Sequence, residues 1–543
     1  MCIIVRTVFA GLALAAVSNA AFAQTAAPPP LPGPVTYVTL AEYNRLLQEG
    51  KIFPVDPAVL ANQAALAEAA YKDNLEVVQA YLNKHPDDTG LAAIVNAVPD
   101  TAAGNPNGLI EWPSGDYQIP FTDKKDRKGS LQTLGQQDKI AAIAHSIQYA
   151  SDPKVQLIVY TELYKRLPQA YLNSDAGKNT IPPSQLEGAS LATIQSVIKS
   201  LTDHTQQIVQ SIPFPAQLPV TGCAAEIGAG DAPQTTWGDR TTSTGCTTPS
   251  PDGILANFNF PGKSQLTCVK QQGARGTCHI FAATSAVEQR VAFDTGKKVN
   301  LSEQDFMEHE KLLWGPAWFG DSGDGGTDLI NALVNNYEFA YEDQWDYNPA
   351  WLQPTNPKVF EYQNTCGNGY PSSEPGCSES APEAPGICVT DMPICALLLA
   401  PVSGKSHDSD PVPLPLPLVP FDWSITVGMM QIFTSADSPV IMGFTASHDF
   451  EYGAPGGYIE YDPSDLNDSK TILGGHVVHV VGYIDNADLA KKLPHAPPGA
   501  GGGYFIIKNS WGACDGDAGY KYMPVAYMEA EAWDLWTLPA MVD

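Results

Sequence analysis

The stretch from residue 474 to 483, GGHVVHVVGY, restricts the fold of this chain more than any other feature. Its β-branched side chains predict a buried strand, and a second strand is predicted at 504–509, after a segment rich in Gly and Pro. Side chains alternate along a strand, so His476 and His479 point to opposite faces. If the two strands pair in antiparallel fashion, the amide of Asn509 comes within reach of the ring of His476.

Cys278 lies at the beginning of a predicted helix. The preceding residues, QQGARGT, form a glycine-containing turn, and the following residues, HIFAATSAVE, are mostly good helix formers. A helix N-terminus favours negative charge and lowers the pKa of a thiol, whose ionised form is the nucleophile. For a single cysteine, a buried small residue or half of a disulfide is the alternative interpretation.

A nucleophilic thiol needs a base that takes and returns a proton, and this base needs a third group that orients it. Cys278, His476 and Asn509 supply the three parts. The sequence therefore predicts a nucleophilic centre assembled from the helix start and the two strands.

The first 23 residues differ in composition from the rest of the chain. Arg6 precedes the apolar run 8–17, and small residues follow up to Ala21-Phe22-Ala23. This order is typical of a secretory signal peptide, here residues 1–23, and predicts export to the periplasm or the extracellular medium. The apolar run is too short for a lasting anchor, and no later stretch approaches the roughly 20 residues that a membrane span needs.

Export changes the interpretation of the cysteines. The chain has 10, and loss of Cys2 with the signal peptide leaves 10 − 1 = 9. An odd number in an oxidising compartment predicts disulfide pairs and one reactive thiol. Local pairing would join Cys366 with Cys377, Cys388 with Cys395, Cys223 with Cys246 and Cys268 with Cys514, but spacing alone leaves other connectivities open.

The charge balance restricts the partners. The chain carries 59 acidic and 30 basic residues, a formal net charge of −29. Such a surface repels phosphate backbones, so no nucleic-acid partner is expected.

The N-terminal region, residues 24–235, is predicted to be mainly helical. Asp56-Pro57 is a typical helix start, and His85-Pro86 ends that helix. Apolar spacing predicts further helices around 140–150, from Asp152-Pro153 onward, and at 191–209. Residues 213–255 are rich in Pro, Thr, Gly and Ser and are interpreted as a linker. The second domain is placed at 236–543.

Five motifs of the second domain, in this order, resemble those of the papain family of cysteine peptidases, the cathepsin-like enzymes. The resemblance runs from about residue 255 to the end of the sequence. The motifs are VKQQGARGTC ending at Cys278, LSEQ at 301–304, Gly325-Gly326, GHVVHVVGY around His476, and YFIIKNSWG at 504–512.

The resemblance implies an α+β fold, a two-lobed papain-like domain with a helical lobe and a β-barrel-like lobe. It also implies a cysteine endopeptidase that hydrolyses peptide bonds of protein or peptide substrates. Cys278 would form a thioester acyl-enzyme, with His476 as general base and acid and Asn509 as its orienting partner. No cofactor and no metal ion are implied.

The resemblance assigns further roles by position. Gln272 matches the glutamine that, with the backbone N–H of Cys278, donates to the oxyanion. Gly325 and Gly326 match the pair that lets a substrate backbone approach closely. Trp511 matches the indole that shields the Asn–His hydrogen bond from water, a role that is compatible with core packing.

Some positions depart from the family pattern. A family disulfide is missing, because Arg275 and His309 occupy its two positions. His279 replaces the tryptophan that usually follows the nucleophile, and Asp515 replaces a second tryptophan after the NSWG motif. These changes leave the principal site positions intact and affect the surroundings of the site.

The spacing within the site predicts an insertion. Cys278 and His476 are 476 − 278 = 198 positions apart, whereas the family has roughly 130–150. Residues 352–421 hold four cysteines and a proline-rich run, so the excess is placed there. Loop insertions of this size cost little entropy.

Several alternatives remain open. Residues 24–235 are either a removable inhibitory pro-segment or a permanent accessory domain. The second domain is alternatively a catalytically silent binding protein or a Cys–His acyltransferase of the transglutaminase kind. Zinc-binding patterns are absent, and Asp321, Asp324 and Asp328 lack the spacing of an EF-hand.

Overall fold

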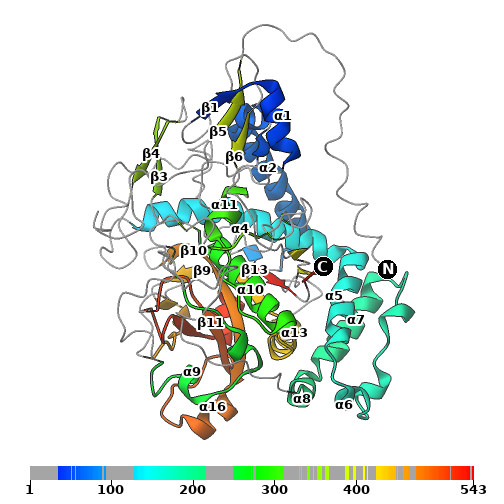
Figure 1. Cartoon of the computed structure of the whole chain (residues 1–543). Coiled ribbons are helices and arrows are strands. Elements are labelled where there is room, and N and C mark those ends of the chain that lie inside the picture. Colours follow the sequence, from blue (N-terminus) through cyan, green and yellow to red (C-terminus); the bar gives the residue numbers. More distant parts are fainter. Residues whose placement is uncertain are drawn as a thin grey trace.

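The structure is a computed structural model of the 543-residue chain (Figure 1). The described residues are 35–49, 52–55, 57–87, 91–92, 127–213, 249–270, 272, 277–309, 329, 332, 339–342, 347, 351–356, 361–365, 386–390, 395–398, 408–409, 412–413, 423–447, 449–450, 456–463, 472–513, 515–538 and 541–542. Within these ranges, no helix combines the length and the apolar character that crossing a bilayer requires.

A six-stranded sheet forms the centre of the C-terminal half. Its strand order is β12 (Tyr520–Pro524), β11 (Gly503–Lys508), β10 (Ile472–Asp485), β9 (Val440–Ser447), β13 (Ala532–Thr537) and β8 (Val412–Pro413). All neighbouring strands pair in antiparallel fashion. The antiparallel pairing considered for the two strands is confirmed, since His479 of β10 lies opposite Lys508 of β11.

The expectation of a β-barrel-like lobe needs correction. Among the described strands the sheet is open, with β12 at one edge and β8 at the other. β8 contributes only two residues, and Pro413 has no backbone N–H to offer a further strand. At the other edge, β12 gains a single bridge from Tyr458 to Tyr522. The fold is therefore mixed α/β, with the site on an open sheet.

The longest helix of the C-terminal half within the described ranges is α10 (Cys278–Thr295), which begins at the predicted nucleophile. It ends at Gly296, whose φ of 69° is a left-handed conformation that glycine adopts without strain. Fifteen of its residues are buried, so it is a core helix. Other α-helices of this half with described bounds are α9 (Ile254–Asn257), α11 (Glu303–His309), α13 (Trp423–Ser435), α16 (Asn486–Lys492) and α17 (Val525–Glu531).

The described N-terminal region is mainly helical, as predicted. Its helices are α1 (Leu40–Gln48), α2 (Pro57–Lys84), α4 (Arg127–Ser151), α5 (Pro153–Lys165), α6 (Gln169–Leu172), α7 (Leu191–Thr202) and α8 (Thr205–Ser211). The Asp152 side chain caps α5 by accepting from the Lys154 N–H at 2.7 Å. The single helix predicted at 191–209 is two helices. The chain turns at Asp203-His204, where the N–H of His204 bonds to the carbonyl of Leu201 and the α-helical pattern stops.

Two strands of the N-terminal region were not predicted. β1 (Val35–Val38) and β2 (Ile52–Val55) flank the hairpin of β5 (Gly386–Val389) and β6 (Cys395–Leu398), in the order β1-β5-β6-β2. The hairpin belongs to the predicted insertion, which also contains β4 (Glu361–Thr365), β7 (Asp408–Ser409) and all but the first residue of β3 (Trp351–Asn356). β7 pairs with β14 (Met541–Val542) near the end of the chain.

Three of the predicted disulfide cysteines lie within the described residues. Cys388 is disulfide-bonded, and Cys395 lies directly opposite it across the β5–β6 ladder. Cys268 is disulfide-bonded as well. Cys223, Cys246, Cys366, Cys377 and Cys514, like the signal peptide and most of the linker, lie outside the described residues.

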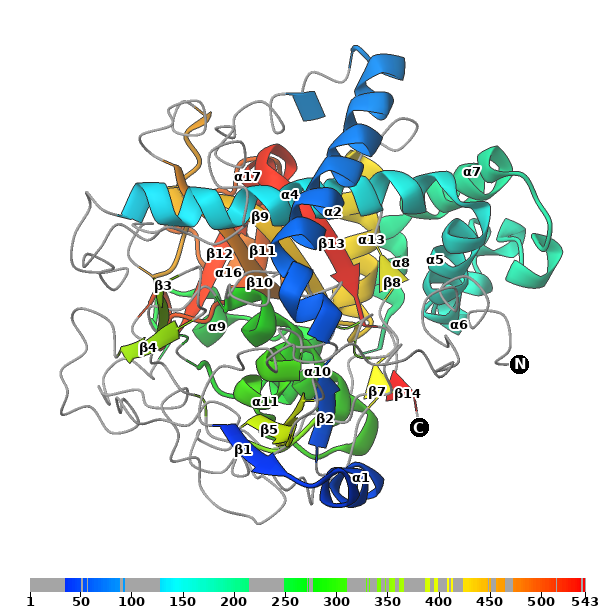
Figure 2. The ribbon, with the colours of Figure 1, turned by 90° about the horizontal axis from the view of Figure 1, so that it is seen from above.

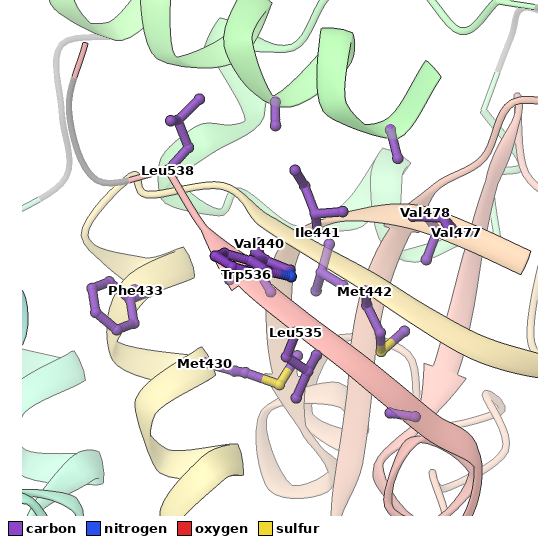
Figure 3. Packing of buried hydrophobic residues seen from close by; sticks show 14 of the residues in the cluster. Met430, Phe433, Val440, Ile441, Met442, Val477, Val478, Leu535, Trp536 and Leu538 are labelled. Atoms are coloured by element: carbon purple, nitrogen blue, oxygen red, sulfur yellow. The ribbon is translucent and has the colours of Figure 1, made fainter. Parts of the chain in front are cut away.

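One continuous apolar core joins the two halves of the chain. It extends from the N-terminal helices, through residues such as Ile143 and Val159, to α10, α13 and the sheet. Figure 2 shows α4 crossing over β9 and β13. Figure 3 shows how side chains of α13, β9, β10 and β13 interlock, among them Met430, Met442 and Trp536.

Candidate active site

His476 and Asn509 form the centre of the predicted site. His476 lies on β10, and Asn509 follows the last residue of β11. The Nε2 atom of His476 is 2.7 Å from Oδ1 of Asn509, and both side chains are buried. This bond uses Nε2 and leaves Nδ1 as the ring nitrogen that can exchange a proton with a nucleophile.

Aromatic side chains enclose the imidazole. The ring of Trp511 lies 4.7 Å from that of His476 between centroids, and the ring of Phe450 lies 5.4 Å away. Burial lowers the pKa of His476 to about 4, against the effect of the Asn509 hydrogen bond and with a smaller contribution from the Lys521 ammonium. In this state the imidazole is neutral over most of the pH range in which proteins are stable.

Gln272 is fixed by the segment that follows Asn509. Its backbone N–H donates to the carbonyl of Ser510 at 2.8 Å, and the Ser510 hydroxyl donates to its Oε1 at 2.5 Å. Since the amide oxygen accepts from Ser510, the amide nitrogen is the part of this side chain that can donate to an oxyanion.

Cys278 carries a reduced thiol and is the first residue of α10. A tyrosine connects the preceding residue, Thr277, to Gln272. The hydroxyl of Tyr347 donates to the carbonyl of Gln272 at 2.7 Å and lies 2.9 Å from Oγ1 of Thr277. The exposed fraction of Cys278 is 9%.

A small cavity shows that these elements meet. It is lined by Phe281 and Ala282, one turn after Cys278, by Val477, next to His476, and by Asn509 and Ser510. Its volume of about 20 Å³ is too small for a substrate side chain. The first turns of α10, β10 and the end of β11 therefore converge at this cavity.

Two residues behind Asn509 were missed as contributors to the site. The Asn509 Nδ2 donates to Oδ2 of Asp515 at 2.6 Å, and Lys521 Nζ lies 3.0 Å from Oδ1 of the same carboxylate. The sequence marked Asp515 only as a departure from the family pattern. That departure was itself the available signal, since a carboxylate in place of a tryptophan needs partners when it is buried.

The other predicted positions are only partly described. His279 is buried, with 1% of its surface exposed. Gly325 and Gly326 lie outside the described residues, as do Arg275, Asp321, Asp324 and Asp328. Within the described part of the chain, no group of three or more His, Cys, Asp or Glu residues is placed to hold a metal ion.

The comparison with known proteins agrees with the motifs. The model of the papain family cysteine proteases matches residues 256–370 and 427–530. The chain is 34% identical over 94 residues to cysteine proteinase 3 of Dictyostelium discoideum, covering 17% of this chain and 26% of that protein. It is 27% identical over 267 residues to cathepsin S of Bos taurus, covering 49% of this chain and 59% of that protein. The chain thus spans less than two thirds of the length of either relative.

Among solved structures, xylellain, a cysteine protease from Xylella fastidiosa, matches with 19% identity and a TM-score of 0.33, covering 54% of this chain and 90% of that one. Residues 371–426, between the two stretches that the family model matches, cover most of the predicted insertion at 352–421. The C-terminal half of this chain belongs to the papain family of cysteine proteases.

Proposed function

We propose that this protein is an exported cysteine endopeptidase with Cys278 as nucleophile and His476 as general base and acid. The observation that carries the proposal is the 2.7 Å contact of His476 with Asn509, in a site where the first residue of α10 is a reduced cysteine. It is the arrangement of nucleophile, base and orienting group that thiol chemistry requires.

In the proposed reaction, Nδ1 of His476 takes the proton of the Cys278 thiol, and the thiolate attacks the carbonyl carbon of the scissile peptide. The Gln272 amide and the backbone N–H of Cys278 donate to the resulting oxyanion. The imidazolium then protonates the leaving amine, which leaves a thioester on Cys278. Water, deprotonated by His476, attacks the thioester and releases the carboxylic acid and the thiol.

Steady-state hydrolysis of a protein substrate tests this proposal with four variants. C278A is expected to abolish hydrolysis, and H476A to reduce kcat nearly as far. Loss of one oxyanion donor in Q272A is expected to lower kcat by about 10²–10³-fold. H495A, at an exposed histidine, is the control and should retain full activity.

Undiminished hydrolysis by C278A would overturn the assignment. If the wild type transferred the acyl group to an added amine rather than to water, the acyltransferase alternative would replace it. Folded wild-type protein that shows neither reaction would favour a silent binding protein.

The export part of the proposal rests on the sequence of residues 1–23. Processing at Ala23 predicts a mature protein that starts at Gln24, and intact-mass measurement of protein recovered from the periplasm or medium tests it. Recovery of the unprocessed chain in the cytoplasm alone would contradict export.

We further propose that the N-terminal region is a permanent accessory part of the folded enzyme rather than a removable pro-segment. Two observations support this. Its helices share one apolar core with α10, α13 and the sheet. In addition, β1 and β2 supply both outer strands of the sheet that contains β5 and β6, so removal would expose the hairpin on both edges.

Cleavage at a specific protease site inserted between residues 236 and 240 tests this second proposal. The two fragments are expected to stay together in size-exclusion chromatography under native conditions. A C-terminal fragment that elutes alone, stays folded and hydrolyses substrate would instead support a removable pro-segment.

A further inference from the structure

The amide of Asn509 contacts two buried side chains, one on each side. Oδ1 lies 2.7 Å from Nε2 of His476, and Nδ2 donates to Oδ2 of Asp515 at 2.6 Å. Asn509 and Asp515 are 3% and 6% exposed. The orientation of this amide therefore depends on whether Asp515 accepts or donates the hydrogen bond between them.

An ionised carboxylate only accepts hydrogen bonds. It therefore holds Nδ2 of Asn509 toward itself and turns Oδ1 toward His476. Because Oδ1 also only accepts, the neutral imidazole must carry its proton on Nε2. Nδ1 then has the lone pair that accepts the proton of the Cys278 thiol.

Lys521 keeps the carboxylate in this role. Its Nζ lies 3.0 Å from Oδ1 of Asp515, and both side chains are 5% exposed or less. A charge-assisted contact of this kind holds both side chains in place. The same Nζ donates to the carbonyl of Phe450 and lies 4.4 Å and 5.1 Å from the ring centroids of Phe450 and Trp511. These are the two rings that pack against His476.

We propose that Asp515, held by Lys521, is a positioning residue that fixes the amide orientation of Asn509 and thereby the tautomer of His476. Asp515 stands at the position where the resemblance implies a tryptophan, so this chain orients the histidine through a hydrogen-bonded ion pair. The inference rests on the proposed peptidase function. It assigns no contact with the substrate to Asp515 or Lys521.

The test uses the double variant D515L/K521M, which replaces the ion pair by apolar side chains and leaves no buried charge alone. We expect kcat to fall on the order of 10–100-fold, as happens when outer partners of metal-bound histidines are removed, with KM unchanged. In an N509A background the same double change should have no further effect on kcat, because Asp515 acts through Asn509.

Asp517 supplies the matched control. It is buried in the same loop and accepts from the backbone N–H of Ser250 and the hydroxyl of Tyr522. D517N is therefore expected to lower the melting temperature without changing kcat. An equal loss of kcat from D515L/K521M with and without Asn509, or no loss at all, would overturn the inference.

A readout that needs no substrate separates this inference from the proposed function. The 15N chemical shifts of His476, assigned with H476Q, should show the Nε2–H tautomer in the wild type. They should move toward the Nδ1–H tautomer in D515L/K521M. Identical tautomers in both proteins would contradict the positioning role, whether or not the wild type hydrolyses peptides.

Discussion

The catalytic half and the N-terminal helices bury lysines in two different ways. In the catalytic half, Lys270 lies 3.0 Å from a carboxylate oxygen of Glu288 and 2.7 Å from one of Glu303, and all three side chains are at most 4% exposed. On α4, Lys139 donates to the hydroxyl of Thr445 at 2.6 Å. Burial lowers the pKa of Lys139 to about 8, and Glu531 only partly opposes this.

The difference indicates which kind of interaction stabilises each region. The elements around Cys278 are joined by full charges that cannot be removed singly without leaving another charge buried. The contact of α4 with the sheet depends on apolar packing, and its lysine contributes little. Side chains in the two regions should therefore respond in opposite ways to loss of charge and to loss of apolar volume.

The largest effect is expected for K270M. It leaves the carboxylates of Glu288 and Glu303 buried without their ammonium, which costs about 3–5 kcal/mol of unfolding free energy. Urea denaturation measures the loss, and K199M, at an exposed lysine paired with Asp203, is the control that should stay near the wild type. If K270M were as stable as K199M, buried ion pairs would not be what stabilises the catalytic half.

The next effect concerns apolar packing in α4. Ile143 is fully buried, and I143A should lower the unfolding free energy by about 2–5 kcal/mol. I158A is the matched control, because Ile158 is 39% exposed. Since the two halves share one core, I143A should shift a single cooperative transition. Two separate transitions, with only one of them shifted, would show that the halves are independent.

Acid should weaken the catalytic half through His476. Its pKa is 6.5 in the ordinary state and about 4 when buried, so the unfolded chain binds more protons between these values. The contribution of His476 to the unfolding free energy is fully present above pH 6.5 and should fall by about 3 kcal/mol as the pH drops to 4. Measured in a C278A background, H476Q should lack this part of the pH dependence. Parallel curves for C278A and C278A/H476Q would contradict it.

The smallest effect is expected for K139M. The substitution removes the hydrogen bond to Thr445, but it also removes a buried ammonium that has no hydrogen-bonded carboxylate. Because these two effects oppose each other, the unfolding free energy at pH 7 should lie within about 1 kcal/mol of the wild type. Between pH 8 and 10.5, Lys139 is deprotonated in the folded chain but still protonated in the unfolded chain. The unfolded chain therefore binds more protons, and the unfolding free energy of the wild type should rise with pH in this range. That of K139M should not. A loss as large as that of K270M would remove the contrast between the regions.

The sequence predicted the site better than its surroundings. Strand periodicity and the motifs placed His476 beside Asn509, and the turn before Cys278 predicted the helix start at that residue. These features depend on local patterns of a few residues. In contrast, the pairing of β1 with β5 is not a local feature, because it joins residues about 350 positions apart. Neither segment has a periodic pattern that would indicate it.

Two further features escaped prediction for physical reasons. The ion pair of Asp515 and Lys521 depends on the loop geometry after Asn509, and a charged residue in a sequence is more often exposed than buried. The open sheet depends on how little of β8 can pair, which only the three-dimensional arrangement decides. The predicted roles of Gly325 and Gly326 in the approach of the substrate backbone, and of Trp511 as a shield of the Asn–His hydrogen bond, stay predictions.

The central claim is that Cys278 is a working nucleophile activated by His476. The most direct measurement is treatment of the folded protein with a peptidyl epoxide under mildly reducing conditions, followed by intact-mass and peptide mapping. We expect a single label on Cys278 in the wild type, and none in C278A or H476A. Absence of label on Cys278 in the folded wild type, from mildly acidic to neutral pH, would contradict it.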